Sequence, residues 1–264
     1  MSPTRSLDQT SLRELNATIL EPVVTSTTLE ETVARLGAAI RVGLLAPGNR
    51  LPPERELAML LRIGRSTLRQ AIEVLTETGH LIRVIGRRGG TFVTSDPPLV
   101  AERVMTSEWH EKLESRMGVE LGVAALATER ITIEDALELH ALIDHMQLLP
   151  TREYRDFRRL DAQFHLKIAQ IARSQALFQA LVELQDCMSW LLTKLPRTDE
   201  AIANAMSRSN AQHRRIVSAL ERHAKTRSLR ETCDHIESTG LVLAGFLAGG
   251  DGHRPADEES RGRR

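Results

Sequence analysis

Aromatic residues are scarce in this 264-residue sequence, where they make up only 3% of the chain. The strands of β-sandwiches and barrels are rich in aromatic and β-branched residues, so this scarcity weighs against an all-β fold. Hydrophobic residues as a whole still reach 41%, which is enough for a core. Most of them are Leu, Ala, Ile and Val, a mixture that favours packed helices.

Cysteine is also scarce, because the chain has only Cys187 and Cys233, in no CxxC pattern. A disulfide scaffold is therefore not expected, and a reducing cytoplasm fits this composition. Long apolar runs are missing as well, since no stretch approaches the roughly 20 residues needed to cross a bilayer. The N-terminus lacks the basic-then-apolar pattern of a signal peptide. We expect a soluble, cytoplasmic protein with no membrane partner.

Neither sign of charge is in excess, because the chain has 35 basic and 35 acidic residues. The charges are nevertheless unevenly distributed. Residues 29–95 carry ten Arg and six Glu, a net charge of +4, whereas residues 97–250 have a net charge of −2. A basic segment joined to a slightly acidic one indicates a polyanion-binding module attached to a second module.

The first third of the chain divides into an arm and a compact module. Residues 1–27 are polar and lack a sustained period, which predicts a flexible arm. Residues 28–95 follow with three helical patterns of apolar residues, the third ended by Thr78-Gly79. Two short β-like runs on either side of the stretch GRRGG then predict a hairpin. Three helices and a hairpin, with the third helix and the hairpin basic, are typical of a winged helix-turn-helix.

The remainder of the chain has no convincing strand pattern. Helical periods run over residues 99–127, 134–148, 152–172, 175–194, 199–221 and 226–247. The breaks between them lie near Thr132, Pro150, Ser174, Pro196 and His223. Residues 99–247 are therefore predicted to form an all-helical bundle of six or seven helices, which makes the protein mainly α. The charged, glycine-rich residues 248–264 are expected to be disordered.

Basic and hydroxyl side chains crowd the first turn of the predicted third helix: Arg65, Ser66, Thr67 and Arg69. The N-terminus of a helix offers unpaired N–H groups and the positive end of its dipole to a phosphate. Hydroxyl groups add further phosphate donors, and an arginine can bind a guanine edge in the major groove through two hydrogen bonds. The pattern indicates a DNA-reading helix rather than a merely solvated surface.

Two further groups extend this predicted DNA-binding surface. Arg55, near the start of the second helix, is placed for contact with a phosphate or a base. Arg87 and Arg88 fall on the predicted hairpin tip beside Gly86, where a thin backbone suits entry into the minor groove.

The segment LPPERELAMLLRIGRSTLRQAIEVLTETGHLIRVIGRRGGTFV resembles the DNA-binding domain of the GntR family of bacterial transcription regulators. The resemblance covers residues 29–95 and is carried by LPPERELA, RSTLRQAIEVL, TGHL and GGTFV in that order. It implies that six residues fall at family DNA-contact positions: Arg55, Arg65, Ser66, Thr67, Arg69 and Gly86. Gly64 and Gln70 depart from the family, which often has Ser or Thr and then Glu there, and they leave the operator sequence open.

A carboxylate and an imidazole stand four residues apart at the edge of an apolar stripe in RLDAQFHLKIAQIA. On a helix, Asp161 and His165 would share a face and lie about 6 Å apart along it. His213 and His235 each share a face with core residues of their own predicted helices. One carboxylate and three imidazoles form a nitrogen and oxygen site that suits Zn²⁺, Ni²⁺ or Mn²⁺. The alternative is core histidines satisfied by hydrogen bonds, with Asp161 as a surface acid.

Residues 99–247 are similar to the FCD ligand-binding domain of the FadR branch of GntR regulators. The similarity rests on ESRMGVELGVAALA, RLDAQFHLKIAQIA, NAQHRRIVSAL and a late DHIE. In metal-binding members an Asp and three His hold the ion, and the resemblance assigns these roles to Asp161, His165, His213 and His235. Arg116 falls where the family has an Arg near the ligand cavity, and would bind an effector carboxylate. A salt bridge from Arg116 to Glu120, four residues on, is the alternative.

Together these features indicate a ligand-responsive transcription regulator, a repressor and homodimer that binds a double-stranded operator with palindromic half-sites. The helical domain, which also dimerises the protein, would bind a divalent metal ion, Zn²⁺ before Ni²⁺ or Mn²⁺, and a small organic or fatty acid. Half-sites have a fixed spacing, so a small rotation of one DNA-binding unit changes operator affinity.

Three alternatives stay open at this point. In the first, the protein is the same regulator, but its effector site binds an acyl-CoA without a metal. In the second, the metal only holds the bundle together. In the third, the protein is a metalloenzyme. The last is disfavoured because the sequence has no HExxH and no general base at a known spacing beside the site.

Overall fold

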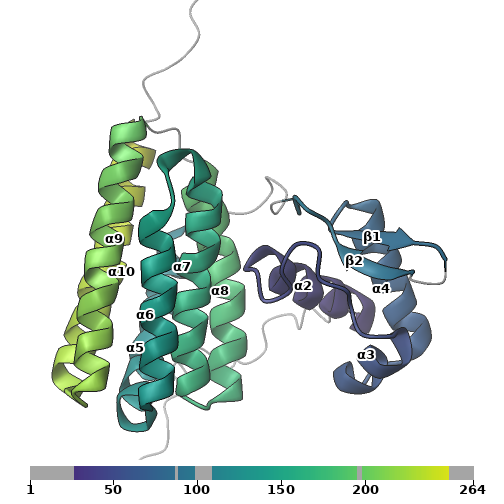
Figure 1. Cartoon of the computed structure of the whole chain (residues 1–264), viewed down its shortest axis with the longest axis horizontal. Helices are drawn as coiled ribbons and strands as arrows, with labels where there is room; N and C mark the ends of the chain where they lie inside the picture. Colours follow the sequence, from purple (N-terminus) through teal and green to yellow (C-terminus); the bar gives the residue numbers. More distant parts are fainter. Residues whose placement is uncertain (1–26, 87–88, 99–108, 195–197, 250–264) are drawn as a thin grey trace, which may run out of the picture.

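The computed structural model describes residues 27–86, 89–98, 109–194 and 198–249. Figure 1 shows two units, a small one that contains a β-hairpin and a bundle of long helices beside it. Most of the expected arm, nearly all of the expected tail, and the hairpin-tip residues Arg87 and Arg88 lie outside the described residues.

The small unit has the element order predicted for a winged helix-turn-helix. Its elements are α2 (Thr28–Arg41), α3 (Glu54–Leu61), α4 (Arg65–Glu77), β1 (Leu81–Val84) and β2 (Gly90–Val93). The two strands pair antiparallel, with Leu81 opposite Val93. Helix α2 begins at a capping box in which the side chains of Thr27 and Glu30 each accept a bond from the other's backbone N–H. Pro53 precedes α3 as its N-cap.

Apolar side chains from the three helices and both strands close the core of this unit. It contains Leu36, Ile40, Leu57, Leu68, Ile72, Leu75, Leu81 and Val93. Spacings of three and four residues place Leu68, Ile72 and Leu75 on one face of α4. The same helix leaves Arg65 and Arg69 exposed, so burial of its apolar face orients its basic side chains toward solvent.

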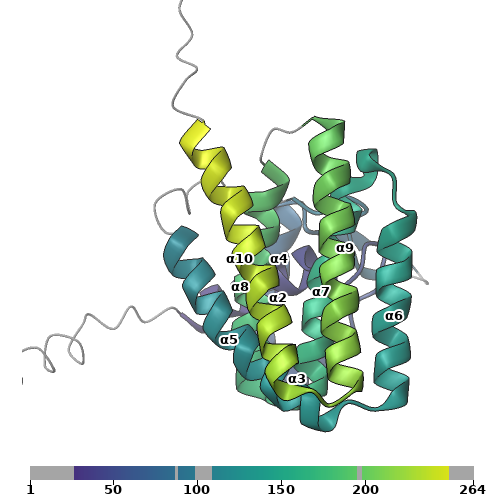
Figure 2. The ribbon, with the colours of Figure 1, turned by 90° about the vertical axis from the view of Figure 1, so that its left-hand side faces the viewer.

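The second unit is the predicted helical bundle (Figure 2). Its elements are α5 (Trp109–Arg130), α6 (Ile133–Leu148), the short 3-10 helix η1 (Thr151–Glu153), α7 (Tyr154–Ile171), α8 (Gln175–Lys194), α9 (Asp199–Glu221) and α10 (Lys225–Gly249). Over residues 109–194 and 198–249 the bundle contains no strand, as predicted. Helix α10 runs through Gly249, so the first two residues of the expected tail are helical.

Local signals end most of these helices where the sequence predicts. A capping box between Thr132 and Asp135 starts α6, and Pro150 precedes η1. Arg173 and His223, just after α7 and α9, take the left-handed conformation that commonly closes a helix. The predicted break at Pro196 lies outside the described residues.

Helix α7 lies at the centre of the bundle, because it packs against α5, α6 and α8. Ten of its 18 residues are buried, and Phe157, Phe164 and Ile168 belong to the main apolar core. A central helix of this kind carries any polar residue on its inner face into the core. None of the helices in the described part of the chain is long and apolar enough to cross a membrane.

Candidate metal centre

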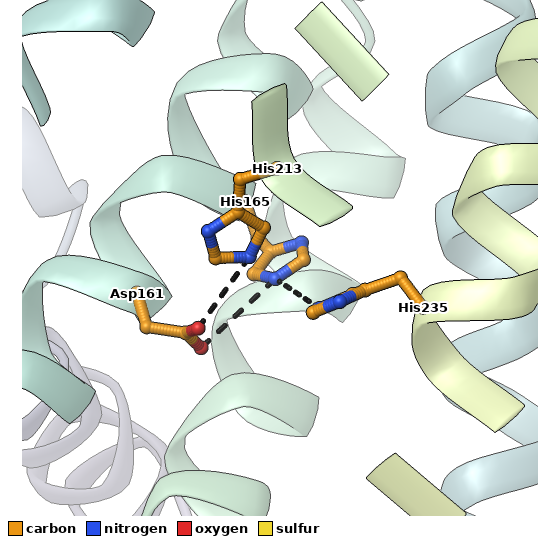
Figure 3. A group of neighbouring side chains, drawn as sticks. All are labelled: Asp161, His165, His213 and His235. Atoms are coloured by element: carbon orange, nitrogen blue, oxygen red, sulfur yellow. Dashed lines mark hydrogen bonds and ion pairs between the residues drawn. The ribbon is translucent and has the colours of Figure 1, made fainter. Parts of the chain in front are cut away.

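Four side chains from three helices meet inside the bundle (Figure 3). Helix α7 supplies Asp161 and His165, α9 supplies His213, and α10 supplies His235. One potential ligand atom from each lies within 4.8 Å of the others. Their exposed fractions are 1%, 2%, 0% and 3%, so the alternative in which Asp161 is a surface acid is wrong.

The separations between the ligand atoms approach those of a metal site. Metal–nitrogen bonds of about 2.0–2.1 Å in tetrahedral or octahedral geometry place neighbouring ligand atoms about 2.8–3.4 Å apart. The Nε2 atoms of His165 and His235 are 3.2 Å apart, and His213 Nε2 is 3.5 Å from Asp161 Oδ1. His165 Nε2 is 4.0 Å from Asp161 Oδ2, so only a small inward movement would close the set around an ion.

Surrounding polar groups orient two of the imidazoles. Glu120 Oε2 lies 2.8 Å from His165 Nδ1, and Gln212 Oε1 lies 3.1 Å from His235 Nδ1. An acceptor at Nδ1 keeps the ring proton there, which leaves the Nε2 lone pair directed toward the cluster. His213 Nδ1 is buried and has no hydrogen-bond partner among the described residues.

The electrostatic environment favours the protonation states that a metal requires. Burial, which opposes a charged imidazole, lowers the pKa of His213 to about 3 and that of His235 well below its usual range. Burial alone raises the pKa of Asp161, but Arg158 and the three imidazoles outweigh it and hold that pKa well below its usual range. At neutral pH the carboxylate is therefore ionised and these two histidines are neutral, as metal ligation demands.

A cavity of about 520 Å³ lies beside the cluster and shares His235 with it. Polar groups of Arg158, Ser209 and Gln212 line it together with apolar side chains such as Phe157. The Ser209 hydroxyl donates a 3.1 Å hydrogen bond to Asp161 Oδ1, which connects the cavity wall directly to the metal ligand. Volumes of this order are typical of sites for small molecules.

Arg158 is a functional candidate that the sequence interpretation missed. It is buried, and its Nη1 lies 3.1 Å from Asp161 Oδ2. Its Nε and Nη2 atoms are buried without a hydrogen-bond partner among the described residues. The available signal was its position three residues before Asp161, which places it on the same inward-facing side of α7.

Arg116, the arginine singled out from the sequence, has a different environment. Its Nε donates a 2.5 Å hydrogen bond to Glu120 Oε1, so the salt bridge considered as an alternative is present. Its Nη2 also lies 3.2 Å from His165 Nε2, which places the guanidinium against the ligand set. Arg116 is not among the residues that line the cavity, so a contact with an effector stays a prediction.

The residues predicted to bind DNA gather at the start of α4 and nearby. Arg65, Ser66 and Arg69 are exposed in its first turns, and Thr67 is half-buried. The N-cap Gly64 makes no side-chain bond, which leaves the first N–H groups of α4 open to a phosphate.

Two more of the predicted DNA-binding residues are exposed close by. Arg55 lies on α3, and the left-handed Gly86 (φ +124°) lies at the end of the hairpin's first strand. Arg69 is held by Glu54 at 3.2 and 3.3 Å, so binding a base would require exchange of this exposed pair. Their contacts with DNA stay predictions.

Comparison with known proteins assigns a family model to each unit. Residues 28–93 match the model of the bacterial regulatory proteins of the gntR family, and residues 111–238 match the FCD domain. The putative HTH-type transcriptional regulator RmpR of Mycobacterium gastri is 32% identical over 211 residues, which cover 77% of this chain and 76% of that protein. The HTH-type transcriptional repressor NanR of Escherichia coli K12 is 27% identical over 213 residues, 75% of this chain and 78% of NanR.

Solved structures agree with this assignment at the level of the fold. E. coli McbR/YncC superposes with a TM-score of 0.52 at 19% sequence identity, and the match covers 84% of this chain and 99% of that one. At this identity the likeness supports the arrangement of a winged helix-turn-helix with a helical bundle and nothing finer.

Proposed function

The chain belongs to the GntR family of bacterial transcription regulators and carries an FCD domain as its effector-binding part, and from this premise we propose that a divalent metal ion and an organic acid bound in the bundle control its affinity for DNA. The observation that carries the proposal is the convergence of four buried ligand atoms beside a cavity. Its relatives are named as transcription regulators, which supports a sensing role for the site.

The donor set favours a borderline metal ion. Three imidazole nitrogens and one carboxylate oxygen, from His165, His213, His235 and Asp161, suit Zn²⁺ first, with Ni²⁺ and Mn²⁺ as alternatives. An effector oxygen could join such a set, because Zn²⁺ can expand from four to five ligands and Ni²⁺ and Mn²⁺ accept six. The metal would supply a Lewis-acidic anchor for that oxygen, and the protein supplies its orientation.

The charges around the cluster explain why the effector is an acid. Two buried cations, Arg116 and Arg158, balance two buried anions, Glu120 and Asp161. A divalent ion would add two positive charges to this neutral group, and uncompensated buried charge is strongly unfavourable. A carboxylate would supply negative charge and also accept hydrogen bonds from the unpaired nitrogens of Arg158.

An acyl-CoA bound without metal is the alternative occupant, and the polar side chains in the cavity wall disfavour it. A long acyl chain is stabilised by apolar surroundings, whereas Arg158, Ser209 and Gln212 would lose hydrogen bonds to water without gaining partners. We therefore place a short polar acid in the cavity.

The regulator would act as a homodimeric repressor in the cytoplasm. One winged helix from each protomer would bind one half-site of a palindromic operator, which requires two copies at a fixed spacing. NanR, which is named a repressor, supports this mode of regulation. Effector binding would change operator affinity by about 1–3 kcal/mol, the usual size of an allosteric coupling.

Elemental analysis of purified protein tests the metal. The wild type and a His140→Ala control, which alters an exposed histidine on α6, are expected to retain about one ion per chain, whereas an Asp161→Ala, His165→Ala double variant loses it. Equal metal content in all three would overturn the proposal. If metal-free protein stays folded and still binds organic acids with unchanged affinity, the ion is only structural.

A further inference from the structure

Three consecutive residues at the end of α2, beginning with its last residue, join the DNA-binding unit to the bundle. Arg41 makes a bidentate salt bridge with Asp186 of α8, with Nε–Oδ1 and Nη2–Oδ2 distances of 2.7 and 2.6 Å. Val42 is fully buried and belongs to the apolar core of the bundle, not to the core of its own unit. The carbonyl of Gly43 accepts a 3.0 Å hydrogen bond from Gln163 of α7. We call Arg41, Val42 and Gly43 the joint.

The joint requires a glycine at its third position for two independent reasons. Gly43 has a φ of +79°, a conformation that side chains rarely adopt. A Cβ atom there would also lie 2.6 Å from Nε2 of Gln163 and 2.7 Å from Cγ of Arg159. The backbone at Gly43 therefore packs directly against side chains of α7, and a side chain at this position would clash with them.

Helix α7 connects the joint to the metal cluster. Gln163 lies two residues from both Asp161 and His165, and at 100° per residue it occupies the opposite face of the helix. The inner face of α7 thus carries two metal ligands, while its outer face holds the carbonyl of Gly43. Any movement of α7 that brings the four ligand atoms closer together would also move the residues of α7 that contact the joint.

Helix α8 provides a second connection through two neighbouring residues. Gln185 donates a 3.1 Å hydrogen bond to Glu120 Oε1, and the other oxygen of Glu120 lies 2.8 Å from His165 Nδ1. The next residue on α8, Asp186, holds Arg41 of the joint.

Arg41 in turn reaches the region after the predicted recognition helix α4. Its Nη1 lies 3.1 Å from Nε2 of His80, whose Nδ1 is 3.0 Å from the hydroxyl of Thr78, the C-cap of α4. Polar contacts therefore lead from the candidate ligand His165 to Gln185, and from its chain neighbour Asp186 to the end of α4.

We propose that the joint, together with Asp186 and Gln163, positions the DNA-binding unit according to the state of the metal site. This inference rests on the proposed function, because it needs an ion at the four ligands. An ion that drew the two ligands of α7 closer to His213 of α9 and His235 of α10 would shift α7, and the two connections would carry that shift to α2 and α4. Asp186 and Arg41 are positioning residues, which act on DNA binding through the placement of α4.

Hydrogen exchange of the full chain, with and without added Zn²⁺, tests the proposal without knowledge of the operator or the effector. In the wild type, Zn²⁺ is expected to slow exchange about threefold or more in residues 154–171, which report the site. A smaller but resolved change is expected in residues 28–45 and 74–84, which report the joint and the end of α4.

The Asp186→Asn variant should keep the response of residues 154–171 and show a smaller response of residues 28–45 and 74–84, because only the connection through Gln163 remains intact. Asp144→Asn is the matched control, because it removes an exposed ion pair with Arg214 and should respond like the wild type. A retained response at the site also shows that a variant is folded. Should Asp186→Asn fail to fold, Gln163→Ala, which removes the bond to Gly43, makes the same test.

The outcomes separate the two proposals. If residues 154–171 of the wild type do not respond to Zn²⁺, the proposed function falls and the coupling falls with it. If the site responds but residues 28–45 and 74–84 do not, the proposed function stands and the coupling is overturned. A transmitted response of wild-type size in Asp186→Asn would remove Asp186 from the connection.

Discussion

The guanidinium of Arg158 lies 3.1 Å from the carboxylate of Asp161, one helical turn before it on α7. This contact uses only one of the three nitrogens, and the other two are buried without a partner among the described residues. A metal ion at the cluster would bind the same carboxylate, so the negative charge of Asp161 would balance the positive charge of Arg158 less completely. Metal binding at Asp161 should therefore favour the binding of a second anion, the effector carboxylate, beside Arg158.

The Arg158→Met variant tests this connection. Removal of one partner of a buried pair costs about 3–5 kcal/mol, because the other charge is left uncompensated, so metal-free protein should be destabilised by roughly that amount. In the variant, Zn²⁺ would supply the positive charge that the Asp161 carboxylate has lost. The rise in Tm on adding Zn²⁺ should therefore be larger for the variant than for the wild type. Thermal unfolding with and without Zn²⁺ measures both effects, and an unchanged or smaller rise would contradict the argument.

Arg158→Met should also remove the response to organic acids. A panel of hydroxy and dicarboxylic acids, added to Zn²⁺-loaded protein, identifies those that raise the Tm of the wild type. None of these acids should raise the Tm of the variant by a comparable amount. An acid that stabilises both proteins equally would exclude Arg158 from the effector site.

His80 predicts a pH dependence of stability. Burial first, and then the nearby charge of Arg41, lower the pKa of His80 to about 4 from its usual value of 6.5. Between these values the unfolded chain binds more protons than the folded chain, so the free energy of unfolding rises with pH and this contribution is lost as the pH falls from 6.5 toward 4. A His80→Asn variant should show a flatter profile over that window.

Urea denaturation at several pH values provides the measurement. His140→Asn is the control, because His140 is a half-exposed histidine on α6 far from the joint in sequence. This control should keep the slope of the wild type. An identical slope in the wild type and His80→Asn would show that His80 does not contribute.

The helices were predictable from sequence because their signals are local. Apolar spacings, the capping residue Thr132 and the break at Pro150 each act within a few residues, and the structure follows them closely. The convergence of the four candidate ligands was also predictable, since Asp161 and His165 are four residues apart and His213 and His235 each share a face with core residues of their own helices.

The joint was not predictable, because its partners are far apart in sequence. Arg41 and Asp186 are separated by 145 positions, and nothing in either local pattern indicates the pairing. In the sequence Val42 is an ordinary apolar residue at a helix end, whereas in the structure it packs in the core of the other unit. In the sequence nothing distinguishes Gly43 from other loop glycines. Only the structure shows that it packs against the bundle.

Arg65→Ala should weaken DNA binding if the start of α4 enters the major groove. Loss of an arginine that binds a base costs about 1–3 kcal/mol and relaxes specificity at one position. Gel-shift titration with a DNA fragment selected from a random pool by the full chain measures the change. Arg227→Ala, which alters an exposed arginine on α10, should bind like the wild type. Equal affinity and specificity in both variants would exclude Arg65 from base contact.

Glu120→Gln should weaken metal binding although Glu120 is not a ligand. The carboxylate is buried, and it holds Arg116 at 2.5 Å, His165 Nδ1 at 2.8 Å and Gln185 at 3.1 Å. Burial alone raises the pKa of Glu120, but Arg116 and His165 outweigh it and keep the group ionised. The glutamine keeps the volume but removes the charge that fixes the ring and increases its basicity.

Changes in the groups that support a ligand histidine typically lower metal affinity about 10–100-fold, and we expect a loss of that size in Glu120→Gln. Competition with a chromophoric zinc chelator at neutral pH measures it. Glu129→Gln, which removes an exposed salt bridge to Lys225, should keep the affinity of the wild type. If folded Glu120→Gln binds Zn²⁺ as tightly as this control, the connection from His165 through Glu120 to α8 does not influence the ion.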